Sequence, residues 1–569
     1  MLLQTMHFWS NLLGVSTVLK SGALKKVDKI VAVGILTRFK HQSSFITTPI
    51  FYVNASPHIG HLYSALLADV THRWQVICGD TGAIFSTGTD EHGQKVQQSA
   101  DSHNCQPKIF CDKVSSDFKR IFDLCEISYT DFVRTTDHRH QKAVEHFWNK
   151  LYSAGYLYEG KYEGWYSTSD ESFLTPSQVI DTPDGKLSVE SGHPVHWTTE
   201  HNYMFRLSQF ESKLLEWIEN NKRAIYPSMF ADIVREWIKA GLQDLSVSRQ
   251  RNRLQWGIQV PNDPSQTIYV WLDALVNYLT VSGYPDKLVS WPATHIIGKD
   301  ILKFHAIYWP AFLMAAGMEP PASIVCHSHW TRDGSKMSKS IGNVVDPNEC
   351  VKKLTCDGFR FCLLREDLLH SDGDYKEEKI AAILNAELAD TFGNLLSRVT
   401  ARSLNPDQTF PEFHTDLFPI HPDGSCRSRA TKEDYELLEK LEHLPELVDK
   451  YYQDFKPYKS IEAIMSCLRL TNAFIQQHEP WTLVKNPTDE NRAWLDTVIH
   501  VAMDSLRICS LLLQPIIPIF CNRLLTRLGV LQTERTNKHL KMFRTQLGNQ
   551  HSLRKLGTND NVMFKKIKI

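Results

Sequence analysis

Two short stretches of the chain combine glycine with cationic side chains in a way that suits phosphate chemistry. The first is HIGH, residues 58–61, which stands between the strand-like run SSFITTPIFYV and the helix-like run HLYSALLADVTHRWQVI. A strand-to-helix turn exposes the unpaired amides of the first helical turn, which attract phosphate. Gly60 leaves room for a ligand, and His58 and His61 can donate hydrogen bonds to phosphoryl oxygens. A lone H-x-G-H is also compatible with ordinary surface or core histidines.

The second stretch is DGSKMSKSIGN, residues 333–343. Gly334 and Gly342 bracket Lys336 and Lys339, a pattern typical of a loop that presents ammonium groups to a polyphosphate. A lysine pair alone is usually part of a solvated surface. Because both stretches suit the same task, their presence in one chain predicts a nucleotide site.

The surrounding elements predict an α/β fold. From about residue 43 to 150, β-rich runs alternate with helical ones, which is typical of a parallel sheet with crossover helices. The region from about 155 to 230 reads as a β-containing insertion. The alternation resumes at QTIYVWLDALVNYLT, so we expect one sheet built from two separated halves. After about residue 376, long amphipathic runs predict an α-helical bundle.

Composition limits the class of protein. The chain has 569 residues, 42% of them hydrophobic, and a net charge of -1. No apolar run approaches the roughly 20 residues of a membrane span. A near-zero charge gives no global attraction for RNA, so an RNA partner would need local basic patches. The 12 cysteines include no C-x-x-C pair and indicate reduced thiols. Cys350, Cys356 and Cys362 recur at a six-residue step, which on one helix favours core packing over metal ligation.

The N-terminal segment has a composition of its own. Between residues 20 and 40 it carries five lysines and one arginine against the single acid Asp28, with one serine and several small residues between them. This composition resembles a mitochondrial presequence more than a secretory signal. A disordered basic N-terminus without a targeting role remains the alternative.

Longer stretches connect the two motifs to a known family. HIGH and KMSKS, residues 58–61 and 336–340, are the two signatures of class I aminoacyl-tRNA synthetases. The intervening sequence resembles the methionyl-tRNA synthetases, and with its N-terminal segment the chain looks like their mitochondrial form. The resemblance covers about residues 43–530. It includes TGTDEHG at 87–93, YEGWY at 162–166, WLDAL at 271–275, IGKDILKFHAIYWP at 297–310 and FGNLLSR at 392–398.

The resemblance implies a Rossmann-type parallel-sheet catalytic domain with an inserted β-containing connective domain, followed by an α-helical bundle that binds the anticodon. The expected boundaries are a presequence or disordered segment at 1–42, a first catalytic half at 43–154, a zinc-free connective insertion leading back to the catalytic core at 155–265, a second catalytic half at 266–375, the helical bundle at 376–533 and a basic tail at 534–569.

The implied reaction is attack of the methionine carboxylate on the α-phosphate of ATP, which arrives with Mg²⁺, followed by transfer of methionine to tRNA. This step needs positioning and charge stabilisation but no general base. The expected catalytic residues are His58, His61, Lys336 and Lys339. The expected ATP-binding residues add Gly60, Asp300, Met337, Ser338 and Ser340 to these.

The resemblance also implies a methionine pocket. Asp90 is expected to bind the α-amino group, while Ile50, Tyr52, Trp271, Tyr278 and His305 line the pocket. A polarizable thioether gains from such aromatic contacts. Arg249 matches a position that faces the active site. The competing interpretation makes Asp90 a turn residue and Trp271 plain core. We expect homocysteine to be rejected within the synthetic site, since there is no large separate editing insertion.

For tRNA, the expected readers of the CAU anticodon are Asn394, Arg398 and Trp481, while the acceptor end enters the catalytic site. An exposed tryptophan can stack on a loop base, and amide and guanidinium groups read base edges. A buried bundle tryptophan with a solvent-facing arginine is the alternative. Tail lysines could hold the tRNA backbone, and the ending VMFKKI resembles a segment that packs back onto the catalytic half.

Many relatives carry zinc-binding cysteines in the insertion, but here Ser167 and Asp170 stand where C-x-x-C would be, so we predict no zinc. The insertion must then have its own core, with Trp165, Trp197, Tyr203 and Phe205 as candidates. We expect a monomer in the mitochondrial matrix. The alternatives are a class I synthetase for another apolar amino acid, or a catalytically silent tRNA-binding paralogue.

Overall fold

The computed structural model describes residues 43–569 except 55, 168–171, 175–177, 184, 190, 338–341, 420–427, 544–553, 559–562 and 569. The chain divides into two units, Met1–Ser43 and Ser44–Ile569, and every described helix and strand lies in the second. The predicted presequence therefore falls outside the described residues, as do Ser338, Lys339 and Ser340.

A six-stranded sheet in which every pair of neighbours is parallel forms the centre of the α/β part of the chain. Its order is β3-β2-β1-β14-β15-β9. The strands are β1 (Phe45–Tyr52), β2 (Ile84–Asp90), β3 (Asp131–Arg134), β9 (Ile225–Tyr226), β14 (Thr294–Gly298) and β15 (Ser323–His327). The strand order reverses between β1 and β14, and in open α/β sheets ligands bind at the carboxyl ends of the strands beside such a reversal.

Apolar helices cover both faces of this sheet. The flanking helices are α3 (Ile59–Ile77), α5 (Pro107–Leu124), α6 (His138–Ser153), α9 (Val270–Leu275), α10 (Asn277–Val281) and α11 (Trp309–Ala315). One core cluster includes residues of α3 and α5, and another includes residues of α6, α9, α10 and α11. The sequence pattern predicted this arrangement: the sheet is parallel, and two separated parts of the chain supply its central pair, β1 and β14.

An antiparallel sheet of order β10-β8-β4-β5 begins after β3 along the sequence, and the edge strand β9 of the parallel sheet lies between β8 and β10 in the chain. The antiparallel strands are β4 (Leu157–Ser167), β5 (Ser172–Leu174), β8 (Val195–Phe205) and β10 (Leu245–Ser246). Tyr203 and Phe205 are buried, as predicted, but Trp197 is 55% exposed and Trp165 is half-buried. The two indoles meet edge to face at 5.3 Å in the outer part of the β4–β8 ladder. The prediction of Trp197 as core was therefore wrong, because strand alternation does not tell which end of a long ladder is covered.

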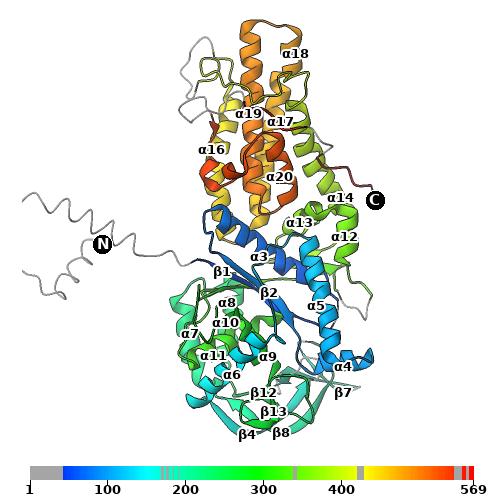
Figure 1. The fold of residues 1–569 in the computed structure, drawn as a ribbon, viewed down its shortest axis with the longest axis vertical. Helices are drawn as coiled ribbons and strands as arrows, with labels where there is room; N and C mark the ends of the chain where they lie inside the picture. Colours follow the sequence, from blue (N-terminus) through cyan, green and yellow to red (C-terminus); the bar gives the residue numbers. More distant parts are fainter. Residues whose placement is uncertain are drawn as a thin grey trace, which may run out of the picture. The chain divides into compact units, whose positions relative to one another are not determined.

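Helices form the C-terminal part of the chain, and the three longest, of 22, 22 and 25 residues, fall where the amphipathic runs predicted them. The helices are α12 (Pro347–Leu354), α13 (Cys356–Leu364), α14 (Glu377–Leu384), α15 (Asn394–Val399), α16 (Lys432–Gln453), α17 (Pro457–His478), α18 (Pro480–Lys485), α19 (Asp489–Leu513) and α20 (Pro518–Arg527), with a π-helical segment, η5 (Asn385–Gly393), between α14 and α15. Figure 1 shows α16, α17, α19 and α20 together, and α19 is buried along most of its length. Thr355, at φ 66°, separates α12 from α13, so the three regularly spaced cysteines lie on two helices rather than one.

The C-terminal segment returns to α13, within the range expected for the second catalytic half, and to η5, within the range expected for the helical bundle. Phe564 is buried, and its ring lies against Gly358, where an added Cβ would come within 3.3 Å of it. The Asn385 amide bonds both backbone groups of Ile567, at 2.9 and 2.8 Å. Lys566 pairs with Asp390 at 2.8 Å.

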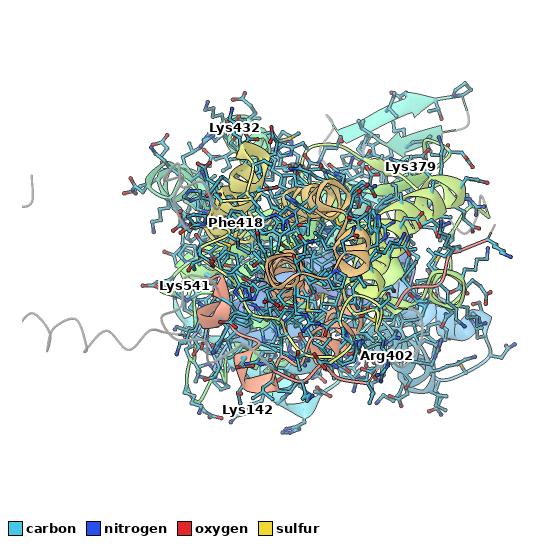
Figure 2. The ribbon with its side chains drawn as sticks, turned by 90° about the horizontal axis from the view of Figure 1, so that it is seen from above. Lys142, Lys379, Arg402, Phe418, Lys432 and Lys541 are labelled. Atoms are coloured by element: carbon cyan, nitrogen blue, oxygen red, sulfur yellow. The ribbon has the colours of Figure 1, made fainter. Side chains whose placement is uncertain are left out.

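Charged side chains of both signs are distributed over the surface. Figure 2 shows Lys142 and Lys432 toward the edge of the molecule, whereas Phe418 lies among the helices and is fully buried. None of the helices in the described ranges combines the length and apolar composition that a membrane span requires.

Candidate active site

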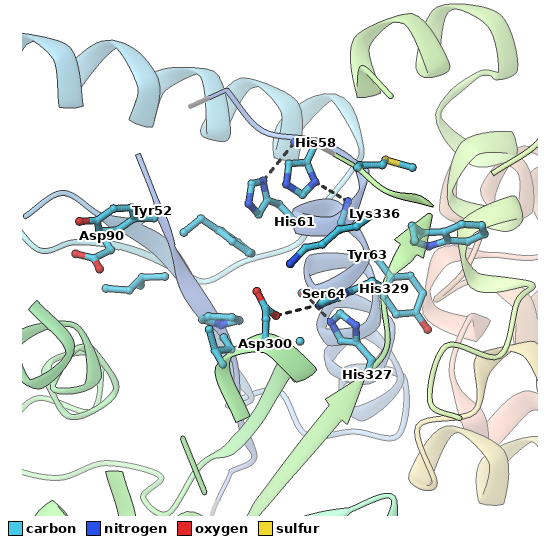
Figure 3. Close-up of a pocket in the computed structure, with 18 of the residues that line it drawn as sticks. Tyr52, His58, His61, Tyr63, Ser64, Asp90, Asp300, His327, His329 and Lys336 are labelled. Atoms are coloured by element: carbon cyan, nitrogen blue, oxygen red, sulfur yellow. Dashed lines mark hydrogen bonds and ion pairs between the residues drawn. The ribbon is translucent and has the colours of Figure 1, made fainter. Parts of the chain in front are cut away.

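A cavity of about 360 Å³ opens at the carboxyl ends of β1 and β14, where the strand order reverses. Figure 3 shows the side chains that surround it. Ten of the residues predicted from the sequence line it: His58, Gly60, His61, Asp300, Lys336, Met337, Ile50, Tyr52, Asp90 and Trp271. The fold therefore brings both signature motifs, more than 270 positions apart in the sequence, to one cavity.

The HIGH residues form the start of α3. His58 is the N-cap, and its Nδ1 accepts a hydrogen bond from the Gly60 amide at 3.1 Å. His61 Nδ1 accepts one from the His58 amide at 3.3 Å, and the two rings stack at 3.8 Å. A ring nitrogen that accepts carries no proton, so the proton of each ring is on Nε2, which is a donor. The first turn of α3 contains no acidic residue, so its amides and dipole favour an anion.

Gly60 has a further role beyond the predicted one. A Cβ at this position would lie 2.9 Å from His58 Cε1. A side chain there would displace the capping imidazole. Glycine is therefore needed to seat His58, as well as to leave space for a ligand.

The KMSKS segment begins on a hairpin formed by β16 (Trp330–Arg332) and β17 (Ser335–Lys336). Asp333 and Gly334 turn the chain with φ values of 53° and 72°. Lys336 and Met337 face the same cavity as the two HIGH histidines. The positions of Ser338, Lys339 and Ser340 lie outside the described residues.

Asp300 lies on the 3₁₀ turn that follows β14. It is held by His329, in the segment between β15 and β16, whose Nε2 is 3.1 Å from Asp300 Oδ1. Gly298, the last residue of β14, has no room for a side chain, because an added Cβ would come within 2.7 Å of the same carboxylate oxygen. Lys299 points elsewhere and pairs with Asp372 at 2.7 Å. The cavity thus has a carboxylate in a fixed position near Lys336.

The other end of the cavity is more apolar. Tyr52 and Asp90 end neighbouring strands and are direct partners in the β1–β2 register. Trp271 stacks on Phe304 with the ring centroids 3.7 Å apart. Ile50 completes this wall. A carboxylate set among aromatic and aliphatic side chains can bind an ammonium group while excluding water from an apolar side chain.

Two residues predicted to line this end lie behind the wall instead. Tyr278 and His305 are each 1% exposed, and neither reaches the cavity surface. His305 Nδ1 donates to the Ile301 carbonyl at 3.0 Å, so Nε2 must accept from the Tyr278 hydroxyl at 2.7 Å. Burial lowers the pKa of His305 to about 4, so the ring is neutral. The pair supports Trp271, whose ring centroid is 6.4 Å from that of His305.

A buried carboxylate joins the two chain segments of this end. Asp273 follows Trp271 by two residues, as His92 follows Asp90. Asp273 Oδ2 is 2.7 Å from His92 Nδ1, and its Oδ1 is 2.7 Å from His140 Nε2. Burial alone would raise the pKa of Asp273, but the two histidines hold it below its usual value.

Two protein-family models match the chain over its α/β part and its helical part. The family model for class I tRNA synthetases (M) matches residues 44–194 and 184–400, and the model for the anticodon binding domain of methionyl tRNA ligase matches residues 422–568. The chain belongs to the class I methionyl-tRNA synthetases. The family predicted from HIGH and KMSKS is therefore confirmed.

Individual relatives agree with this family. The chain is 52% identical over 538 residues to the mitochondrial methionine–tRNA ligase of Homo sapiens, covering 92% of this chain and 90% of the relative. It is 46% identical to a probable mitochondrial methionine–tRNA ligase of Dictyostelium discoideum, covering 86% and 87%. A Mycobacterium tuberculosis methionyl-tRNA synthetase in complex with methionyl-adenylate superposes with a TM-score of 0.85 at 35% identity, covering 92% of this chain and 99% of that one.

In this synthetase fold, the predicted anticodon residues lie on two helices of the C-terminal half. Asn394 and Arg398 are exposed on α15, one turn apart, and the Asn394 amide donates to Asp390 at 3.2 Å. Trp481, on α18, is half-buried and packs against the core cluster of the bundle. Its indole is thus partly exposed, between the two alternatives that the sequence allowed.

Arg249 does not reach the large cavity. It is 3% exposed and lies 4.5 Å from the ring of Tyr269 and 5.5 Å from that of Tyr166, beside a separate small pocket. The described residues contain no group of three or more histidine, cysteine or acidic side chains placed to hold a metal ion. Asp170, one of the two residues from which we predicted the absence of zinc, lies outside the described residues.

Several cavity residues were missed from the sequence. The most informative are Ser64, Lys95, His327 and His329. Ser64 follows His61 by three positions, which places both on one face of a helix. His327 and His329 alternate at the end of a strand, in the sequence CHSH. These spacings were visible, but neither carries a chemistry-specific pattern by itself.

Proposed function

We propose that the cavity is where this ATP-dependent ligase activates methionine and then transfers it to a mitochondrial methionine tRNA. The observation that carries the proposal is the composition of the cavity. One end offers imidazole, helix-terminal amide and ammonium donors, and the other offers Asp90 in an apolar wall. A triphosphate suits the first end, and a zwitterion with an apolar side chain suits the second.

In the first step a carboxylate oxygen of methionine attacks the α-phosphorus of ATP. The bond from this phosphorus to the bridging oxygen breaks, and its electron pair leaves with pyrophosphate. No proton is transferred, so the protein must position two anions and stabilise the charge that develops. We assign this task to the Nε2–H groups of His58 and His61 and to the ammonium groups of Lys336 and Lys339. ATP enters with Mg²⁺ as part of the substrate.

The remaining ATP contacts are assigned to the backbone at Gly60, to Asp300 and to the loop residues Met337, Ser338 and Ser340. For methionine, Asp90 binds the α-ammonium while Ile50, Tyr52 and Trp271 contact the side chain. Tyr278 and His305 act from behind this wall. Because His305 accepts from Tyr278 and its pKa is lowered to about 4, it presents no charge to the thioether.

For the tRNA, we assign the CAU anticodon to Asn394, Arg398 and Trp481 and the acceptor end to the cavity. The domain boundaries that we propose are the expected ones, with a catalytic domain in two halves (43–154 and 266–375), a connective insertion (155–265), an anticodon-binding bundle (376–533) and a basic tail (534–569). The ranges matched by the two family models support the division into a catalytic and an anticodon-binding part.

We further propose a zinc-free monomer in the mitochondrial matrix, with residues 1–42 as the targeting segment. The relatives from Homo sapiens and Dictyostelium discoideum are called mitochondrial, which supports the compartment. Elemental analysis of the purified protein tests the zinc content. We expect less than about 0.1 zinc per chain, because structural zinc sites use thiolate ligands and the insertion offers none at the expected positions. One zinc per chain that resists dialysis would overturn this part.

Methionine-dependent exchange of pyrophosphate into ATP tests the central proposal. Exchange should depend on methionine and be far weaker with leucine, isoleucine or valine, because a pocket that fits one apolar side chain discriminates by about 1–3 kcal/mol per methylene. Equal exchange with another apolar amino acid would reassign the substrate. Absence of exchange in a folded preparation that binds tRNA would indicate a silent paralogue.

A further inference from the structure

The nucleotide end of the cavity contains a buried pair that the sequence did not reveal, Ser64 and His327. Ser64 Oγ lies 2.7 Å from His327 Nε2 (Figure 3). Ser64 is 4% exposed and His327 is 3% exposed, and both contribute to the cavity wall. Ser64 comes from α3, one turn after His61, whereas His327 ends β15.

The hydrogen bonds determine where the proton of this pair lies. His327 Nδ1 is 2.7 Å from the Ser328 carbonyl oxygen, which can only accept, so Nδ1 carries a proton. Burial lowers the pKa of His327 to about 4, so the ring is neutral and has no second proton. Nε2 must therefore accept, and Ser64 must donate to it. The single hydroxyl proton of Ser64 is used within the protein.

The position of His327 is itself constrained. The ring of Tyr63 meets it edge to face, with the centroids 4.9 Å apart. On the other side an added Cβ at Gly298 would approach His327 Cε1 to 3.8 Å, so the ring is packed between two chain segments. A ring fixed in this way also fixes the direction of the Ser64 hydroxyl.

The consequence is chemical selectivity. With its proton committed to His327, Ser64 Oγ can offer a ligand only its lone pairs, so it pairs with a hydrogen-bond donor and not with an acceptor. Asp300 lines the same cavity and is likewise an acceptor when ionised. Phosphate oxygens are also acceptors, so they do not suit the part of the cavity lined by Ser64 and Asp300. The donors of ATP are the two sugar hydroxyls and the exocyclic amine of adenine.

We propose that Ser64, oriented by His327, accepts a hydrogen bond from the nucleoside half of ATP and contributes to nucleotide specificity. Ser64 is the residue that touches the ligand, and His327 is a positioning residue. This inference rests on the proposed function, because it takes ATP as the occupant of the cavity. It adds to that function a recognition element for the sugar or the base.

The experiment compares four nucleotides in methionine-dependent pyrophosphate exchange: ATP, 2′-deoxy-ATP, 3′-deoxy-ATP and purine riboside triphosphate, which lacks the exocyclic amine. In the unsubstituted protein, the analogue that lacks the donor facing Ser64 should lose roughly 3–10-fold in kcat/KM relative to ATP, as expected for one neutral hydrogen bond. In Ser64→Ala, the kcat/KM of this analogue should be less than about twofold below that of ATP, because the hydrogen bond is already absent. The losses in kcat/KM for the other analogues should persist. The affected analogue identifies the donor as a sugar hydroxyl or the amine.

Ser505→Ala is the matched control, because Ser505 is also fully buried and bonds only the Val501 carbonyl in α19. It should leave all four values unchanged. If Ser64→Ala lowers kcat/KM by the same factor for every nucleotide, or leaves it unchanged for all of them, the inference is wrong. Binding of the same nucleotides, measured by calorimetry, gives the same comparison when exchange is absent, so that failure of the proposed function and failure of this inference are distinguished.

His327→Phe tests the positioning role and keeps a ring against Tyr63. In that background, Ser64→Ala should have less than a further twofold effect on kcat/KM, because Ser64 has lost the acceptor that orients it. Independent, multiplicative losses would contradict the coupling. Long-range proton–nitrogen NMR of histidine-labelled protein should show His327 protonated on Nδ1 only, and protonation on Nε2 would overturn the assigned direction of the Ser64 hydroxyl.

Discussion

The carboxylate of Asp273 should matter more for methionine than for ATP. It is 1% exposed and makes two contacts of 2.7 Å, one to His92 and one to His140. Asn has nearly the same shape but keeps only one acceptor, so Asp273→Asn loses one of two charge-assisted bonds. Such a bond contributes about 1.5–3 kcal/mol. Asp90 is two residues from His92, and Trp271 is two from Asp273. Loss of one of these hydrogen bonds should therefore make the positions of Asp90 and Trp271, which we assign to methionine binding, less well fixed.

If the whole of roughly 2 kcal/mol appeared in methionine binding, it would correspond to about a 30-fold rise in the methionine KM, at 1.4 kcal/mol per tenfold. Part of it will instead lower the free energy of unfolding, so we expect a rise of roughly 3–30-fold. The KM for ATP should change by less than about twofold, because the nucleotide end keeps its contacts. Pyrophosphate exchange at varied methionine and varied ATP gives both constants.

Asp504→Asn is the matched control. Asp504 is 4% exposed and bonds Arg507 at 2.7 Å within α19, far along the chain from the cavity residues. This variant should lose stability without a change in the methionine KM. Equal increases in the two KM values of Asp273→Asn, or a methionine KM that stays constant while stability falls, would refute the role of Asp273 in holding the methionine end.

Three further outcomes can be checked on the same preparation. Lys336→Ala should lower pyrophosphate exchange by about 100-fold, as for loss of one transition-state donor, while tRNA affinity measured by filter binding is retained; a loss of both would place Lys336 elsewhere. Trp481→Ala should weaken aminoacylation of tRNA and spare exchange, and unchanged aminoacylation would exclude it from the anticodon site. The pKa values of His305 and His327 are lowered by burial to about 4, so only the unfolded chain binds their protons between about pH 6.5 and 4. Stability should therefore fall as the pH drops through this window in urea denaturation, and His305→Gln should reduce that dependence.

The sequence predicted the fold because its signals were periodic and local. Alternating strand and helix patterns predicted a parallel sheet made from two separated parts, and the β1–β14 pair confirms this for its centre. The edge strand β9 was not predicted, because it comes from within the range expected for the insertion. The strand-to-helix turn at HIGH was equally clear, and His58 caps α3 there. The reason for Gly60 was only partly visible, since the 2.9 Å approach to His58 depends on how the imidazole folds back over the turn.

The rest of the site depends on tertiary contacts. The pairing of Ser64 with His327 spans 263 positions, and no spacing in the sequence indicates which histidine a helical serine will meet. Tyr278 and His305 were predicted to line the pocket, and only packing decides that they lie behind its wall. Trp197 was assigned to a core because large aromatics usually are buried, yet the ladder that carries it has an open face at that end.

One element links the cavity to the helices that we assign to tRNA. Helix α3 starts at HIGH, and further along it Trp74 donates from Nε1 to Asp449 of α16 at 2.8 Å. Asp69, also on α3, is bonded at 2.6 Å by Arg360, which in turn donates at 2.7 and 2.8 Å to the carbonyls of Pro515 and Ile516 before α20.

Asp69 and Arg360 are both fully buried, and removing one partner of such a pair costs about 3–5 kcal/mol. A shift of α3 against the bundle would break these bonds and leave a buried charge unpaired. The N-terminal end of α3, at HIGH, therefore keeps a fixed position relative to α16 and α20. We therefore expect that a tRNA bound by the bundle, as we propose, brings its acceptor end to the cavity without a movement of α3.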